Sequence, residues 1–179
     1  MKILVFGHSG QVATELRALD GDDVQITALA RADADLTEPA ACAAAITAHA
    51  PDAVINAAAY TAVDKAESDA ETAQIINADA PAAMAQACAA RDIPFVSIST
   101  DYVFSGAGDT PWAPADPTDP QSVYGRTKRD GEVAIVKTGG GWDCASSGKR
   151  PKAPEYPTSR PPPQPRLKPT RCPHRPKPN

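Results

Sequence analysis

The sequence predicts an α/β fold, a doubly wound parallel sheet, because short apolar runs alternate with helical stretches along most of the chain. The run ILVFG at 3–7 has the length and apolarity of a buried strand and ends in glycine. The stretch GQVATELRAL then places Val12, Leu16 and Leu19 on one helical face. Strands that alternate with helices form a parallel sheet covered on both faces, so this opening strand, turn and helix predict the architecture.

The later elements repeat the same unit. Further strands are expected at 23–30, 52–59 and 94–100, and helices at 38–50, at about 68–91 and around Tyr124. Ligands of such sheets bind beyond the carboxyl ends of the strands. The segments GHSGQ, NAAAYT and STDYVF each follow a predicted strand, so we expect them to line a binding site.

Composition divides the chain into an acidic body and a basic tail. Residues 1–136 hold 8 Lys+Arg against 20 Asp+Glu, whereas 137–179 hold 10 against 2. The second part has no Val, Ile, Phe or Met and carries eleven of the nineteen prolines, so it has little apolar surface to bury. We expect one compact domain over 1–137 and a disordered, Pro/Arg-rich tail over 138–179.

Targeting and metal signals are weak. The N-terminal apolar run is too short for a signal-peptide core or a membrane span, so no membrane partner and a cytoplasmic location are expected. The cysteines lack C-x-x-C spacing, which favours reduced thiols over a disulfide framework. Cys172 and His174 are two candidate ligands in a proline-rich segment, which is too few for a site, and no metal is expected.

The first turn carries a G-x-x-G-x-x-A pattern at Gly7, Gly10 and Ala13. Gly7 permits a tight turn, Gly10 lets a pyrophosphate approach the backbone, and Ala13 allows the helix to pack closely. The adjoining helix N-terminus offers N–H donors to phosphates. This pattern is typical of a Rossmann-type dinucleotide site, although a plain turn is the alternative for the pattern alone.

Arg31 follows the second strand, where NAD-binding folds often carry an acidic residue. A guanidinium there is suited to a 2′-phosphate, which favours NADPH. Asp33 lies two residues on and a solvated surface arginine is as common, so NADH stays open.

Tyr124 and Lys128 are four residues apart on a predicted helix and therefore project from the same face. A phenol has an ordinary pKa of about 10, and a neighbouring ammonium lowers that pKa toward the range useful for proton transfer. The pair suits protonation of a carbonyl oxygen during hydride transfer. Y-x-x-x-K also occurs often by chance.

The sequence resembles the extended short-chain dehydrogenase/reductases, and among them the dTDP-4-dehydrorhamnose reductases. The resemblance runs from Met1 to about Val136 through ILVFGHSGQVATEL, NAAAYTAVDKAESD, STDYVFSGAGDTPW and VYGRTKRDGE. It implies a catalytic trio of Thr100, Tyr124 and Lys128. It also implies a cofactor-binding set that comprises Gly7, Gly10, Gln11, Val12, Asp35, Leu36, Ala59, Tyr60 and Thr61.

The resemblance implies NAD(P)H-dependent reduction of the C4 ketone of dTDP-6-deoxy-L-lyxo-4-hexulose to dTDP-L-rhamnose. Tyr124 would then donate a proton to the forming alkoxide and Thr100 would hydrogen-bond the same oxygen. Lys128 would hold the nicotinamide ribose and lower the pKa of Tyr124. Trp112 is expected either to form a wall of the sugar pocket or to pack within its loop, and Thr100 has the simpler reading of a strand-end cap.

Departures from the family begin near Lys137. There the family continues with another strand and a smaller domain that closes over the nucleotide sugar, whereas this sequence turns Pro- and Arg-rich, as a shifted reading frame would. We therefore expect a truncated NAD(P)-binding domain at 1–137, a missing substrate domain, an unpaired strand edge beside FVSIST, and impaired activity. Asp130 also stands where the family usually carries a small residue.

Other functions stay open at this point. One is a non-catalytic nucleotide-binding or regulatory module of the same family, and another is a related nucleotide-sugar epimerase or dehydratase. The basic tail alone suggests a nucleic-acid or SH3-like partner only by composition, so no nucleic acid is expected. The expected ligand is a dTDP-4-keto-6-deoxy sugar, and a homodimer is left open.

Overall fold

The computed structural model describes residues 1–107, 111–139 and 141–144, the last of these as backbone only. Five parallel strands form one sheet in the order β2-β1-β3-β4-β5. The strands are β1 (Lys2–Phe6), β2 (Gln25–Leu29), β3 (Ala53–Asn56), β4 (Phe95–Ile98) and β5 (Gly141–Cys144). The predicted α/β fold with a doubly wound parallel sheet is confirmed, because the strand order reverses direction after β2.

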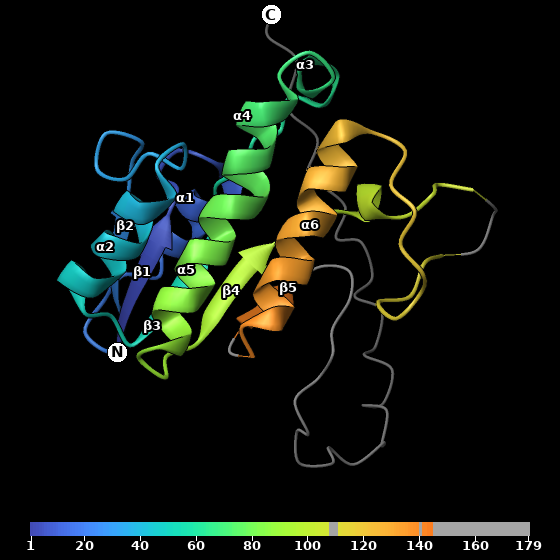
Figure 1. Ribbon diagram of the computed structural model, residues 1–179. Helices are drawn as coiled ribbons and strands as arrows, with labels where there is room; N and C mark the ends of the chain where they lie inside the picture. The colour runs from blue at the N-terminus through green and yellow to red at the C-terminus, as the bar shows by residue number, and fades with distance from the viewer. Residues whose placement is uncertain (108–110, 140, 145–179) are drawn as a thin grey trace, which may run out of the picture. The chain divides into compact units, whose positions relative to one another are not determined.

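Helices cover both faces of this sheet. α1 (Gln11–Arg17) lies on one face, and α2 (Pro39–His49), α5 (Ala80–Ala89) and α6 (Val123–Lys137) lie side by side on the other (Figure 1). The remaining helical segments are α3 (Val63–Ala66), α4 (Ala70–Gln74), the π-helical turn η1 (Ile75–Asp79) and the 3₁₀ turn η2 (Asp101–Val103). The predicted helix at 68–91 is therefore α4, η1 and α5 in succession, with a π-helical turn in the middle.

The core lies between the sheet and the α2, α5 and α6 layer. Leu4, Phe6, Val54 and Phe95 point from the strands toward Met84 of α5 and are all buried. Small residues of α5 at intervals of three and four let that helix approach the sheet closely. Because the strands pair in parallel, the carboxyl ends of β1 to β4 lie at the same edge of the sheet.

The expectation of an unpaired edge beside FVSIST is wrong. Residues Gly141–Cys144 pair in parallel with Phe95–Ile98, so β5 lies beyond the domain boundary that composition placed at 137. Backbone pairing to an open strand edge explains β5, because the edge of β4 offers N–H and C=O groups regardless of side-chain apolarity. The expected tail otherwise lies outside the described residues, as do Cys172 and His174.

Cys42 and Cys88 are free, buried thiols on α2 and α5. Burial raises the pKa of the Cys42 thiol to about 11 and that of the Cys88 thiol to about 12. Both residues therefore behave as small core side chains. Within the described part of the chain, no helix combines the length and the apolarity needed to cross a bilayer.

Candidate active site

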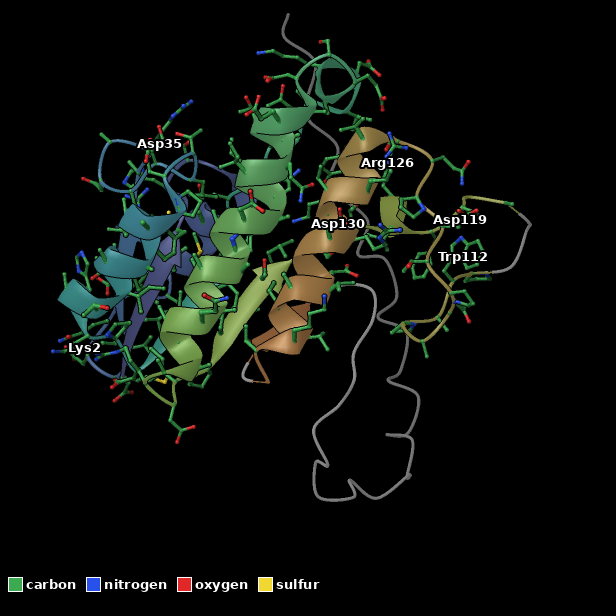
Figure 2. All side chains as sticks on the ribbon, in the orientation of Figure 1. Lys2, Asp35, Trp112, Asp119, Arg126 and Asp130 are labelled. Carbon is green, nitrogen blue, oxygen red and sulfur yellow. The ribbon has the colours of Figure 1, made fainter. Side chains whose placement is uncertain are left out.

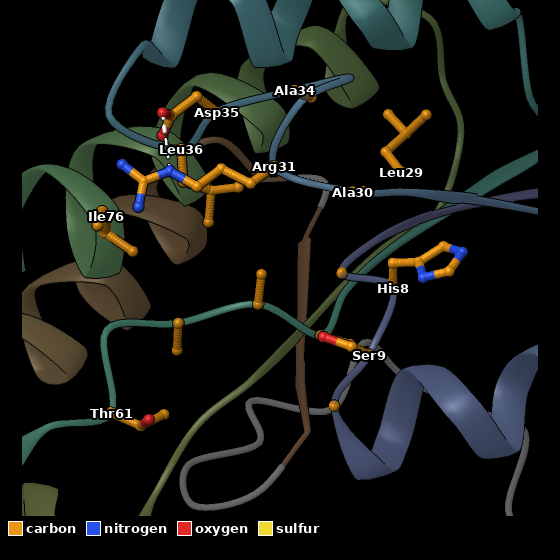
Figure 3. Close-up of a pocket in the computed structure, with 15 residues that line it drawn as sticks. His8, Ser9, Leu29, Ala30, Arg31, Ala34, Asp35, Leu36, Thr61 and Ile76 are labelled. Atoms are coloured by element: carbon orange, nitrogen blue, oxygen red, sulfur yellow. Dashed lines mark hydrogen bonds and ion pairs between the residues drawn. The ribbon is translucent and has the colours of Figure 1, made fainter.

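A cleft of about 460 Å³ opens at the carboxyl ends of β1, β2 and β3 (Figure 3). Its walls are the loops that follow these three strands and one residue of η1. The lining residues are Gly7, His8, Ser9, Gly10, Leu29, Ala30, Arg31, Ala34, Asp35, Leu36, Ala57, Ala58, Ala59, Thr61 and Ile76. The cleft thus lies where strand topology predicts a ligand site.

The fold constrains the two glycines of the first turn differently. Gly7 has a φ of +114°, and a Cβ there would lie 3.3 Å from the backbone carbon of Ala57, so the fold itself requires glycine. Gly10 has an ordinary φ of −73°, and a Cβ added to it would meet no described atom within 4 Å. The fold does not require glycine at position 10, which leaves the space in front of its backbone for a ligand.

The loop after β2 carries an ordered pair of charges at the mouth of the cleft. The Arg31 Nε donates to Asp35 Oδ2 at 3.0 Å, as the dashed line in Figure 3 marks. The Thr37 backbone N–H and then Arg31 hold the pKa of the Asp35 carboxyl below its ordinary value of 3.8. The Asp33 carboxylate accepts from the Ala30 N–H at 2.9 Å within its own turn. The Arg31 side chain is 78% exposed, so the loop presents a cation at the cleft.

Most of the predicted cofactor residues come together in the cleft, and some do not. The predicted residues that line it are Gly7, Gly10, Arg31, Asp35, Leu36, Ala59 and Thr61. Gln11 and Val12 lie exposed at the start of α1, outside this lining. Tyr60 also points elsewhere, because its hydroxyl donates to Asp69 Oδ2 at 3.0 Å.

Thr100 and Tyr124 of the predicted catalytic trio are neighbours. Thr100 follows β4 and caps η2, where its Oγ1 accepts from the Tyr102 N–H at 3.3 Å and donates to Asp101 Oδ1 at 3.3 Å. Tyr124 lies in the first turn of α6, and the Tyr102 ring packs edge-on against its ring at 5.6 Å. Thr100 lies near enough to the Tyr124 phenol to act on its pKa, in the direction that lowers it.

The pKa of Tyr124 is raised above its ordinary value of 10.0, not lowered as the sequence argument predicted. Burial is the largest cause, and the charge of Asp101 and the neighbouring Tyr102 add to it, while the Thr100 hydrogen bond opposes them. The reasoning from sequence considered only the ammonium of Lys128. Burial favours the neutral phenol, which is the form that donates a proton.

Lys128 is 5% exposed and its Nζ donates to the Ile98 carbonyl oxygen at 2.6 Å. The ammonium therefore contacts the last residue of β4, two positions before Thr100. Lys128 does not line the cleft described above. Its predicted contact with a nicotinamide ribose stays a prediction.

Two glycines let α6 approach its neighbours. A Cβ on Gly125 would lie 2.3 Å from the Tyr102 carbonyl oxygen, and a Cβ on Gly131 would lie 2.3 Å from the Asn77 carbonyl oxygen. Ser122 caps the start of the helix, because its Oγ accepts from the Gly125 N–H at 3.1 Å. α6 is thus fixed against η1 on one side and η2 on the other.

Asn77 of η1 is a residue that the sequence argument missed. It is 2% exposed; its Oδ1 accepts from the Tyr60 N–H at 2.9 Å and its Nδ2 donates to the Tyr60 carbonyl at 3.1 Å. The same Nδ2 donates to Thr127 Oγ1 on α6 at 3.1 Å. Asn77 thereby ties the loop after β3, which lines the cleft, to the helix that carries Tyr124. An asparagine inside an Ala-rich helical stretch was the available signal, because asparagine disfavours helix interiors.

Ser99 and Glu132 were also missed. Glu132 is 5% exposed, and the Ser99 hydroxyl donates to its Oε1. Glu132 follows Lys128 by one helical turn, so spacing alone places the two side chains on one face of α6.

Trp112 packs within its loop, one of the two expected roles. Its ring stacks on Phe104 with centroids 5.1 Å apart and planes 4° from parallel, and 39% of Trp112 is exposed. Figure 2 shows it on the long loop that also carries Asp119, away from Asp35 at the cleft. Its predicted contact with a sugar stays untested.

Asp130 is accommodated at the surface of α6 in an ion pair with Arg129 at 2.8 Å, with both side chains over a third exposed. This departure from the family pattern therefore leaves the buried face of the helix unchanged. Among the residues described, no group of three or more His, Cys, Asp or Glu side chains is placed to hold a metal.

Comparison with known proteins covers the same part of the chain. Residues 1–142 match the model of the RmlD substrate binding domain family. The dTDP-4-dehydrorhamnose reductase of Burkholderia thailandensis is 46% identical over 142 residues, which are 79% of this chain and 48% of that protein.

Solved structures agree with this match. A dTDP-4-dehydrorhamnose reductase from Clostridium acetobutylicum superposes with a TM-score of 0.76 at 37% identity, over 80% of this chain and 52% of that one. The Bacillus anthracis dTDP-4-dehydrorhamnose reductase in complex with NADP gives 0.75 at 26% identity, over 79% and 51%. The chain spans about half the length of the relatives it matches. By its sequence match over residues 1–142, this chain belongs to the RmlD substrate binding domain family.

Proposed function

We propose that residues 1–144 form the cofactor-binding and proton-donating part of an NADPH-dependent reductase. The substrate in this proposal is a dTDP-4-keto-6-deoxy sugar, reduced at C4. The observation that carries it is the cleft with open space at Gly10, at the carboxyl ends of the strands, where Thr100 follows β4 and lies near Tyr124 of α6. The relatives support the same reaction, because proteins named dTDP-4-dehydrorhamnose reductase match this chain over about half of their own length.

The cleft fits a dinucleotide. Backbone at Gly10 faces open space that a pyrophosphate would fill, and the exposed Arg31 offers a cation where a 2′-phosphate would lie. The carboxylate of Asp33 is engaged with Ala30 N–H and does not oppose that charge directly. NADPH therefore fits better than NADH, although the Arg31–Asp35 pair also leaves a carboxylate near the same loop.

When bound, NADPH would supply the hydride to the ketone carbon. The chain's own contribution is the proton and the position of the ketone oxygen. Tyr124, kept neutral by burial, donates its phenolic proton to that oxygen, and Thr100 donates a hydrogen bond to the same atom. Lys128, buried against the Ile98 carbonyl, fixes α6 relative to the end of β4.

The test compares two polypeptides, the 179-residue chain and a chimera in which the second half of the Burkholderia thailandensis reductase follows residue 142. NADPH oxidation is measured at 340 nm with dTDP-6-deoxy-L-lyxo-4-hexulose. We expect turnover in the chimera and NADPH binding without turnover in the 179-residue chain, because the remaining half of the relatives would contribute substrate contacts.

In the chimera, Tyr124→Phe should lower kcat by about a thousandfold with NADPH affinity nearly unchanged, since it removes a proton donor and little surface. A chimera that binds NADPH and never turns over would favour the non-catalytic module instead. Full activity in Tyr124→Phe would reject Tyr124 as the acid.

A further inference from the structure

Two side chains of α6 hold consecutive residues at the end of β4. Lys128 Nζ donates to the carbonyl of Ile98 at 2.6 Å, and Glu132 accepts from the hydroxyl of Ser99. The next residue is Thr100. Two hydrogen bonds, made by α6 residues one helical turn apart, therefore join the segment before Thr100 to the helix that carries Tyr124.

Both of these hydrogen bonds are made by ionisable side chains that are buried. Lys128 and Glu132 are each 5% exposed, and together with Ser99 they line one small pocket between β4, α6 and Asn77 of η1. Burying a carboxylate is unfavourable unless hydrogen bonds compensate for the lost water. The Ser99 hydroxyl supplies one such hydrogen bond to Glu132.

The contacts that Thr100 makes with the residues after it are longer than ordinary hydrogen bonds. The Thr100 Oγ1 donates to Asp101 Oδ1 and accepts from the Tyr102 N–H, both at 3.3 Å and both long for such bonds. The Tyr102 ring in turn packs edge-on against the Tyr124 ring at 5.6 Å. These local contacts are weak restraints. The bond of Ser99 to Glu132 is a charge-assisted restraint on the adjacent residue.

We infer that Glu132 is a positioning residue which, through Ser99, holds Thr100 in place beside the Tyr124 phenol. The inference deepens the proposed reductase function, because it assigns a residue that aligns the hydrogen-bonding and proton-donating groups of that site. The route from Glu132 to Thr100 is the hydrogen bond to Ser99 and the peptide unit that joins Ser99 to Thr100.

The chain offers a matched set of variants. Ser99→Ala removes the donor to Glu132 and little else, and Ser99→Thr restores a hydroxyl. Glu132→Gln keeps an acceptor oxygen for Ser99, whereas Glu132→Ala removes it. Ser97→Ala is the control, because Ser97 is also buried on β4 and lines the same pocket, but its hydroxyl accepts from Asn56 Nδ2.

The primary readout is the ¹³Cζ resonance of Tyr124 in the 179-residue chain labelled at tyrosine, assigned with Tyr124→Phe. That resonance reports the hydrogen bond of the phenol and needs neither cofactor nor substrate. Ser99→Ala should shift it in the same direction as Thr100→Val, which removes the hydroxyl directly. Ser99→Thr, Glu132→Gln and Ser97→Ala should leave it close to the wild-type position. Urea unfolding of each variant identifies those that fail to fold.

A wild-type resonance in folded Ser99→Ala would overturn the inference, even if Glu132→Ala does not fold. A shift of equal size in Ser97→Ala would also overturn it, because a general loosening of β4 would then be the cause. In the active chimera, Ser99→Ala should lower kcat by about tenfold with the KM for NADPH unchanged. If the chimera has no activity while the resonance shifts as expected, the proposed reaction fails and the positioning role stands.

Discussion

The cleft and the surroundings of α6 are built in opposite ways. In the cleft, Gly10 faces space in which a Cβ would meet no described atom within 4 Å, and Arg31 is 78% exposed. Around α6, a Cβ on Gly131 would lie 2.3 Å from backbone, and Lys128 is 5% exposed. The same residue type, glycine, thus leaves room for a ligand in one region and permits close packing in the other.

The difference shows how the site divides its tasks. The cleft leaves polar groups and space available to a ligand that comes from outside. The α6 region pairs polar groups internally, through Asn77, Ser99 and Glu132, so that the helix that carries Tyr124 is fixed before any ligand arrives. Substitutions in the two regions should therefore have separable effects, on binding in one and on folding in the other.

The largest effect should come from Gly131→Ala. The new methyl group would overlap the Asn77 carbonyl oxygen, and overpacking against backbone lowers the free energy of unfolding by about 3 kcal/mol. Urea unfolding followed by circular dichroism measures it. The same change at an unobstructed helical site would raise stability by about 1 kcal/mol, so a stable Gly131→Ala would refute the close contact of α6 with η1.

Gly10→Val should change binding and not folding. The valine would fill the space assigned to a pyrophosphate, and we expect NADPH affinity to fall at least about a hundredfold in fluorescence titration, with an unchanged helical signal. Gly21→Val is the matched control, because a Cβ there also meets no described atom and Gly21 lies outside the cleft lining. Equal affinities in the two variants would remove Gly10 from the cofactor site.

Alkaline pH should destabilise the core beneath both regions. The Cys88 thiol has a pKa of about 12 in the folded protein and an ordinary value of 9.0. Its contribution to the free energy of unfolding is therefore fully present below pH 9 and is lost as the pH rises toward 12. The free energy of unfolding should fall by about 1.4 kcal/mol per pH unit for this thiol. Cys42, which contacts the Asp35 carbonyl under the cleft and has a pKa of about 11, should add a similar slope over a shorter range.

Urea unfolding at pH 8, 9 and 10 of wild type, Cys88→Ala and Cys42→Ala checks this. Each substitution should remove the part of the pH dependence of the free energy of unfolding that its thiol causes. An unchanged pH dependence in Cys88→Ala would mean that other groups cause the alkaline loss.

A smaller effect is expected for Arg31→Ala in the cleft. Loss of the exposed cation should weaken NADPH about tenfold and leave NADH nearly unchanged, because only NADPH carries the 2′-phosphate. Arg17→Ala provides a control for total charge, since Arg17 contacts the His8 carbonyl from α1 and does not line the cleft. A parallel loss for both nucleotides in Arg31→Ala would point to a loop change through Asp35.

The sequence allowed the cleft to be predicted better than the α6 region. Gly7 and Gly10 directly follow the first strand, so local pattern and strand topology suffice to predict their place, whereas Asp35 and Thr61 were expected in the cleft from the family resemblance. The links between Asn77 and Tyr60, or Glu132 and Ser99, join residues far apart in the chain, and no local pattern specifies them.

Two errors have the same origin. Tyr124 was judged from its helical neighbour Lys128, whereas burial by the tertiary structure determines the direction of its pKa shift. β5 was missed because the sequence GWDC is shorter and less apolar than a typical buried strand. Its strand conformation comes from backbone pairing with β4. In both cases tertiary context outweighed local sequence.

The central claim is that the cleft and Tyr124 belong to one site, so that a nucleotide bound at Gly10 reaches the phenol on α6. The most direct measurement is the Tyr124 ¹³Cζ resonance during titration of the tyrosine-labelled chain with NADPH. We expect the resonance to move and saturate at the concentration at which NADPH fluorescence saturates, and to stay still in Gly10→Val. NADPH that saturates the chain without moving Tyr124 would contradict the claim and separate the two regions.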